Sequence, residues 1–183
     1  MSTERSVDLL VLGLGNVLCG DDGLGVVAVH RLLRRYRPPD RVSVLDGGTL
    51  GLSLLPYLED AREVILVDAI RADGPPGSFV RLEGEEVAPA VAGRLSPHQV
   101  GVADLLDGAR WRDRYPARLI LLGLVPETLL LGVGRTPPVE TALPLLVEQV
   151  VAEAGRLGYP FTRRAGDEAL VRSPGDLAHL YGV

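Results

Sequence analysis

The chain contains five short apolar runs, and segments of helical periodicity lie between most of them. Each run is rich in Val, Ile and Leu and is bounded by Gly, Pro or Asp, which is typical of β-strands. Three runs are almost continuously apolar, as expected for central strands that are covered on both faces. The predicted strands are residues 7–13, 41–46, 63–70, 78–83 and 118–125.

Segments with apolar residues at helical spacing predict helices at residues 23–36, 50–58, 98–109 and 139–158. The alternation of strands and helices indicates an α/β fold. We expect a three-layer sandwich, in which a twisted, mostly parallel five-stranded sheet carries helices on both faces. The run at 78–83 follows "DGPPG", which leaves too little chain for a helical crossover. That strand is therefore expected to be antiparallel or to lie at the sheet edge.

Length and charge limit the domain organisation and the class of partner. A chain of 183 residues, 46% of them hydrophobic, is long enough for one well-buried core. We expect a single α/β domain over residues 1–158, followed by a weakly patterned tail, 159–183, of unassigned role. A net charge of −5 argues against a nucleic-acid partner, which requires a basic face. All 19 basic residues are arginine, so chemistry that depends on lysine is excluded.

The sequence also predicts a cytoplasmic protein without a membrane segment. The longest apolar runs, such as residues 119–125, are far shorter than the roughly 20 residues that span a bilayer. The N-terminus lacks the pattern of a signal peptide, and the single cysteine, Cys19, allows no internal disulfide.

The stretch "VLGLGNVLCGDDGLG", residues 11–25, follows the first predicted strand, where open α/β sheets bind their ligands. It is not a dinucleotide fingerprint, because Leu18 stands where the third glycine is required. It is not a P-loop either, because the chain has no lysine. One of the two adjacent aspartates, Asp21 or Asp22, is expected to cap the following helix. The other aspartate then needs a different role.

Two further polar residues are expected near the same edge of the sheet. Asp68 ends the apolar strand 63–70, and His98 follows Ser96 and Pro97 at the start of a predicted helix. Two carboxylates and an imidazole form a nitrogen and oxygen ligand set that suits nickel or zinc and leaves coordination positions open. With 24 acidic residues in the chain, convergence by chance is the alternative explanation.

The sequence resembles the endopeptidases that mature nickel-iron hydrogenases. The resemblance extends from about Val7 to about Gly158 and is carried by blocks in the family's order and spacing: "GLGNVLCGDDGLG", "LDGGTLGLSLLPYL", "VILVDAI", "PPGSFVRL", "SPHQVGVADLL" and "GLVPET". It implies an enzyme that removes a C-terminal peptide from the hydrogenase large-subunit precursor after nickel insertion. It also implies that Asp22, Asp68 and His98 contact nickel, which the precursor supplies, so the isolated protein should be largely metal-free.

From the sequence alone, Asp46 and the adjacent Gly47 are expected to form a turn. The resemblance implies that they bind substrate instead, and Glu127 is a weaker candidate for the same role. After "GLVPET", the run "LLLGVGRTPPVE", residues 129–140, follows the family only loosely. No separate catalytic nucleophile is assigned. His30 is expected to pack beside apolar neighbours, and His179 to be an ordinary surface residue.

The sequence leaves the cleavage mechanism open. The bound nickel could position the scissile bond, or the ion could itself activate a water or the carbonyl. A different enzymatic alternative is a Cys19 thiol nucleophile with His98 as its base. A non-enzymatic alternative is a nickel-binding checkpoint chaperone that binds the precursor without cleaving it.

Overall fold

The computed structural model describes residues 5–92 and 101–165, and its centre is a five-stranded sheet in the order β3-β1-β4-β6-β5. Strands β1, β3, β4 and β6 are parallel, and β5 pairs antiparallel with β6 at the edge. The predicted fold class is therefore confirmed. The strands are β1 (Val7–Leu14), β3 (Val42–Gly48), β4 (Ala61–Ala69), β5 (Phe79–Glu83) and β6 (Arg118–Leu124).

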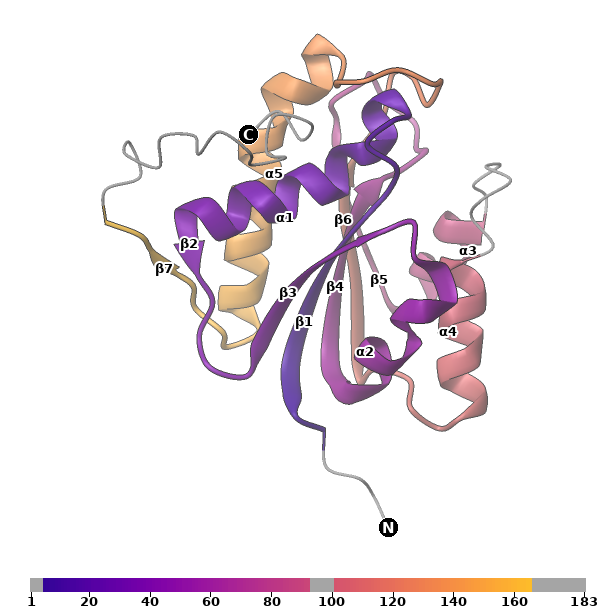
Figure 1. Cartoon of the computed structure of the whole chain (residues 1–183), viewed down its shortest axis with the longest axis vertical. Helices are drawn as coiled ribbons and strands as arrows, with labels where there is room; N and C mark the ends of the chain where they lie inside the picture. The colour runs from indigo at the N-terminus through magenta and orange to yellow at the C-terminus, as the bar shows by residue number, and fades with distance from the viewer. Residues whose placement is uncertain (1–4, 93–100, 166–183) are drawn as a thin grey trace.

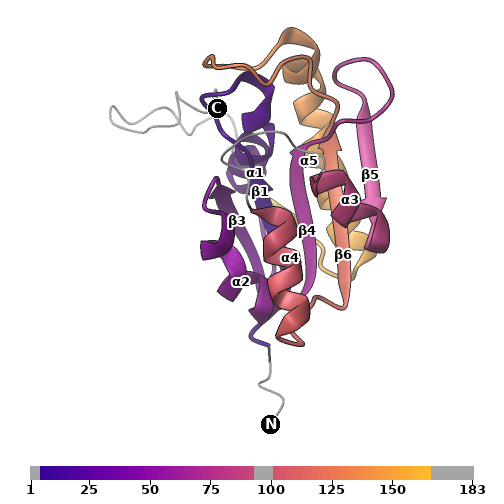
Figure 2. The ribbon, with the colours of Figure 1, turned by 90° about the vertical axis from the view of Figure 1, so that its right-hand side faces the viewer.

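Helices cover both faces of the sheet (Figures 1 and 2). One face carries α1 (Leu24–Arg35) and α5 (Pro137–Arg156). The other face carries α2 (Leu55–Asp60), α3 (Val87–Ala92) and α4 (Val102–Trp111). Short 3-10 turns precede three of these helices: η1 (Gly20–Gly23), η2 (Gly51–Leu54) and η3 (Gly84–Glu86).

The predicted helices at 23–36 and 139–158 correspond to α1 and α5. The predicted helix at 50–58 begins as the 3-10 turn η2 and continues as α2. Of the predicted helix at 98–109, residues 101–109 are described, and 102–109 belong to α4. Within the described ranges, none of the helices is both long and apolar enough to cross a membrane.

The core consists of two apolar layers, because alternate residues of each central strand face opposite sides of the sheet. In β4, Ile65 and Val67 pack under α1 and α5, whereas Val64 and Leu66 pack under α2 and α4. Asp68 has the same parity as Val64 and Leu66. Its side chain therefore leaves the sheet on the face that α2 and α4 cover.

A two-stranded ribbon pairs β2 (Tyr36–Arg37) with β7 (Thr162–Arg163), and no pattern in the sequence predicts it. Next to the ribbon, Tyr159 and Phe161 pack against the α1 and α5 side of the core. Residues 159–165, which the sequence assigned to the tail, thus contact the folded domain. The proposed boundary at residue 158 stays a prediction.

Candidate functional site

The carboxyl ends of β1 and β4 meet at one edge of the sheet, at the top of Figure 1. The chain leaves β1 through α1 and reaches β3 on one side, and it then returns through α2 to β4 on the other side of β1. Open α/β sheets bind ligands at such a switch point, because the loops diverge and leave a crevice. The loop from Gly15 to Gly23 and the end of β4 border this position.

Two glycines allow the β1 loop to fold back onto the sheet. Gly15 has a φ of +117°, and a Cβ atom there would lie 1.7 Å from the carbonyl oxygen of Asp22. A Cβ atom on Gly25 would lie 2.0 Å from the carbonyl oxygen of Val67. Side chains at these positions would displace the backbone, so both glycines are required to bring Asp22 and the start of α1 against the strand ends.

Asp21 has a structural role that its sequence position does not reveal. Its side chain is fully buried and accepts four hydrogen bonds from the loop that follows β6. Oδ1 accepts the amide of Thr136 at 2.7 Å, and Oδ2 accepts the Thr136 hydroxyl and the amides of Glu127 and Thr128 at 2.9 to 3.2 Å. Asp21 therefore fastens the β6 loop to the β1 loop.

Asp22 lies beside Asp21 but has a different environment. It is 7% exposed, and its Oδ2 accepts the backbone amide of Asn16 at 2.7 Å. The expectation that one aspartate caps α1 is wrong, because Gly23 occupies the N-cap position and no side-chain hydrogen bond caps the helix there. The intervening 3-10 turn moves both aspartates ahead of the cap, so their carboxylates bond to loops instead.

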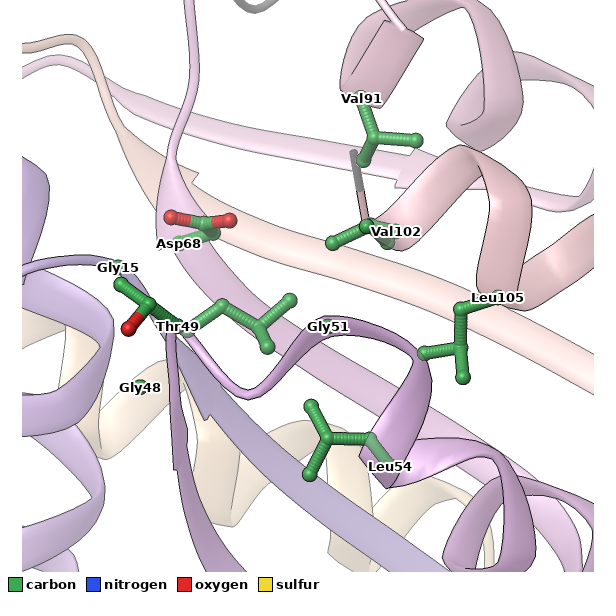
Figure 3. A pocket seen from close by; sticks show the side chains of 11 residues that line it. Gly15, Gly48, Thr49, Gly51, Leu54, Asp68, Val91, Val102 and Leu105 are labelled. Carbon is green, nitrogen blue, oxygen red and sulfur yellow. The ribbon is translucent and has the colours of Figure 1, made fainter. Parts of the chain in front are cut away.

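Asp68 is fully buried at the end of β4, and its Oδ1 accepts the amide of Ala69 at 2.8 Å. It lines a pocket with about 460 Å³ of empty space, open mouth included. Figure 3 shows the Asp68 carboxylate on one side of the pocket and apolar side chains on the other. The other lining residues are Leu14, Gly15, Gly48, Thr49, Gly51, Leu54, Val91, Gly101, Val102 and Leu105.

Gly15 connects the two candidate carboxylates, because it lies against the backbone of Asp22 and also lines the pocket of Asp68. Both side chains offer oxygen donors of the kind that divalent ions accept, so the donors present fit such an ion. The third candidate, His98, lies outside the described residues. Within 5–92 and 101–165, no group of three His, Cys, Asp or Glu side chains is arranged to hold a metal.

Asp46 lies two residues before the end of β3, at the same edge of the sheet. Its Oδ2 lies 2.9 Å from Nε2 of His30 on α1, and about a third of each side chain is exposed. The sequence interpretation of His30 as a packing residue missed this hydrogen bond. Gly47 is buried, and a Cβ atom there would lie 2.8 Å from a methyl group of Leu12. A role of Asp46 and Gly47 in substrate binding stays a prediction.

The other two candidates lie on the loops that Asp21 joins. Cys19 is half-buried, forms an isolated bridge with Gly132, and precedes η1 directly. The alternative in which the Cys19 thiol is the nucleophile stays a prediction, because its base, His98, lies outside the described residues. The Glu127 residue is exposed, while its amide donates to Asp21.

Comparison with known proteins gives consistent similarities. Residues 26–153 match the family model described as hydrogenase maturation protease. The hydrogenase 2 maturation protease of Escherichia coli is 39% identical over 165 residues, which is 90% of this chain and 96% of that protein. The hydrogenase expression/formation protein HupD of Bradyrhizobium diazoefficiens is 41% identical over 153 residues, which is 80% of this chain and 79% of that protein.

The solved structures include the hydrogenase maturating endopeptidase HybD from E. coli. It superposes on this chain with a TM-score of 0.82 at 38% identity, over 87% of this chain and 99% of HybD.

Proposed function

The chain belongs to the hydrogenase maturation protease family, and from this membership we propose that it removes the C-terminal extension of a nickel-iron hydrogenase large-subunit precursor after nickel insertion. Nickel is then a part of the substrate, because the precursor supplies it. Asp22, Asp68 and His98 are the proposed contacts to that nickel. The protease would thereby act only on a precursor that has received its metal.

The observation that carries this proposal is that Asp22, in the loop after β1, and Asp68, near the end of β4, lie at the same carboxyl edge of the sheet, where Gly15 contacts the backbone of Asp22 and lines the pocket of Asp68. Asp22 is 7% exposed and Asp68 is fully buried, so each has given up most of its contact with water. Burial of a carboxylate is costly, and a backbone amide bonded to each of these two offsets part of that cost. Carboxylates kept at the mouth of an open α/β sheet are placed for a ligand, and here a ligand with a positive charge suits them.

The residues of this chain would bind and orient the substrate. Asp22 and Asp68 would contact the precursor's nickel and place the adjacent peptide against the pocket, whose apolar wall includes Leu54 and Leu105. Asp46, near the end of β3, would orient the peptide. His30 lies 2.9 Å from one carboxylate oxygen of Asp46 and would hold that side chain in place. A divalent ion beside a peptide bond can polarise its carbonyl or lower the pKa of a bound water.

Three substitutions test the proposal. Asp22→Asn, Asp68→Asn and His98→Ala should each abolish cleavage of nickel-loaded precursor, followed by mass spectrometry, while circular dichroism shows a folded protein. The matched control is Asp40→Asn, which changes an exposed aspartate in the turn before β3 and should cleave at the wild-type rate. Full cleavage by Asp22→Asn or Asp68→Asn would refute the proposed contacts. Wild-type protein that binds the precursor but releases no peptide would instead be a checkpoint chaperone.

A further inference from the structure

Four large apolar side chains stand exposed on the two loops that Asp21 joins. Leu18 is 50% exposed, Leu130 77%, Leu131 86% and Val133 70%. We call these four residues the apolar rim. Solvent-exposed apolar residues are common when scattered, but a group of them on one pair of loops is typical of a binding surface.

The apolar rim is held in its exposed position by main-chain hydrogen bonds. Gly20 donates its amide to the carbonyl of Gly132 at 2.8 Å, and Gly132 donates to the carbonyl of Leu18 at 2.8 Å. At the ends of the β6 loop, the Asp21 carboxylate binds the amides of Glu127 and Thr136. These bonds fix the backbone from which the apolar side chains project, and the fold thereby keeps an apolar surface in contact with water.

The rim shares a loop with one of the proposed nickel contacts. Leu18 lies on the loop that leads into η1, and η1 contains Asp22. The hydrogen bonds of the adjacent Asp21 bind the β6 loop to this same segment, so a protein substrate at Asp22 has both loops nearby. Beneath the rim lies an open hollow with about 560 Å³ of empty space, lined by Gly20, Thr128, Leu130, Leu131, Gly132, Val133, Gly134, Arg135 and Thr136.

The chemistry of this hollow favours an uncharged partner. Arg135 is the one charged residue in its described lining, and its side chain is only 6% exposed. Its Nε donates to Glu140 at 3.0 Å, and Arg31 shares that carboxylate, so the Arg135 guanidinium is engaged inside the fold and is not offered to a partner. Three of the four rim residues, Leu130, Leu131 and Val133, fall within residues 129–140, where the sequence follows the family only loosely, as expected for a surface matched to one particular substrate.

We propose that the apolar rim docks an apolar segment of the hydrogenase precursor and contributes to the choice of that precursor. The proposal rests on the proposed function, because it takes its occupant from the substrate of the protease. The rim acts in binding and takes no part in bond cleavage. Its loss should therefore raise KM and leave kcat unchanged.

The test compares kinetics of nickel-loaded precursor cleavage by wild type, Leu131→Ser and the double variant Leu130→Ser with Leu131→Ser. Leu131→Ser should raise KM about tenfold, and the double variant further, with an unchanged kcat and melting temperature. Leu131→Met, which keeps the apolar character, should retain the wild-type KM. The control is Trp111→Ser, since Trp111 is 89% exposed at the far end of α4 and should have no kinetic effect.

The possible results separate this proposal from the proposed function. If wild type does not cleave nickel-loaded precursor, the proposed function fails. If wild type cleaves and the serine variants have the wild-type KM, only the docking proposal is overturned. If wild type sediments as a dimer and the double variant as a monomer, the rim joins two copies of this chain, and the docking proposal is again overturned.

Discussion

Substitution of Asp21 by asparagine should destabilise the protein far more than the same substitution at the adjacent Asp22. The Asp21 carboxylate accepts four hydrogen bonds from the loop after β6. Asparagine has one oxygen in place of two. If that oxygen replaces Oδ2, the new NH₂ group faces the amide of Thr136, which the carboxylate accepts at 2.7 Å in the wild type.

The expected magnitude follows from these contacts. Loss of one hydrogen bond to a charged group costs about 1.5–3 kcal/mol. The opposed donors and the weaker remaining bonds add to this, so Asp21→Asn should lower the free energy of unfolding by about 2–4 kcal/mol. For a chain of this length, the melting temperature should fall by about 4–16 °C. Asp22→Asn keeps an oxygen for the amide of Asn16 and should cost about 1 kcal/mol or less.

Urea unfolding followed by far-ultraviolet circular dichroism measures both variants against wild type. We expect a lower midpoint for Asp21→Asn with an unchanged slope, which indicates a change of stability alone. A destabilisation below about 1 kcal/mol for Asp21→Asn would refute the reasoning. The same conclusion would follow if Asp22→Asn were destabilised equally.

Three further predictions concern other parts of the fold. The hydrogen bond from Arg81 lowers the pKa of buried Glu153, so this carboxylate stabilises the protein above its unfolded-state pKa, and the stabilisation is lost as the pH falls through the lower folded-state value. Glu153→Gln should therefore cost about 1–3 kcal/mol at pH 7 and progressively less in acid, measured by urea unfolding at several pH values. Cys19→Ala should process precursor at close to the wild-type rate in a mass-spectrometric assay, and inactivity with preserved folding would favour the thiol mechanism. Asp46→Asn should lower kcat/KM about tenfold in the same assay without unfolding the protein, because it weakens an orienting contact, and a wild-type value would exclude that role.

Much of the fold could be predicted from the sequence because its signals are local. A continuous apolar run such as 63–70 indicates a buried strand, and alternation along it places Asp68 on a definite face. The short "DGPPG" turn likewise indicates the antiparallel edge strand β5. The two-residue strands β2 and β7 escaped prediction, because their four residues carry no periodic pattern.

The roles within the site were less predictable, because they depend on contacts between distant residues. Asp21 and Asp22 are neighbours of the same type, and no pattern separates them. The residues that bind Asp21 are 106 to 115 positions further along the chain. The partner of Asp46 is His30, on a different element, and only the packing of α1 beside β3 brings the two together.

The central claim is that this protein cleaves its substrate only when the substrate contains nickel. The most direct test is a mass-spectrometric time course with three forms of the precursor. Metal-free, nickel-loaded and zinc-loaded precursor would be supplied at equal concentration to the same wild-type protein. Zinc favours tetrahedral ligands, whereas nickel accepts square-planar or octahedral ones, so the two metals separate recognition by geometry from recognition by charge. We predict rapid cleavage of the nickel-loaded form, much slower cleavage of the zinc-loaded form and an intact metal-free form. Equal rates for all three would contradict the claim.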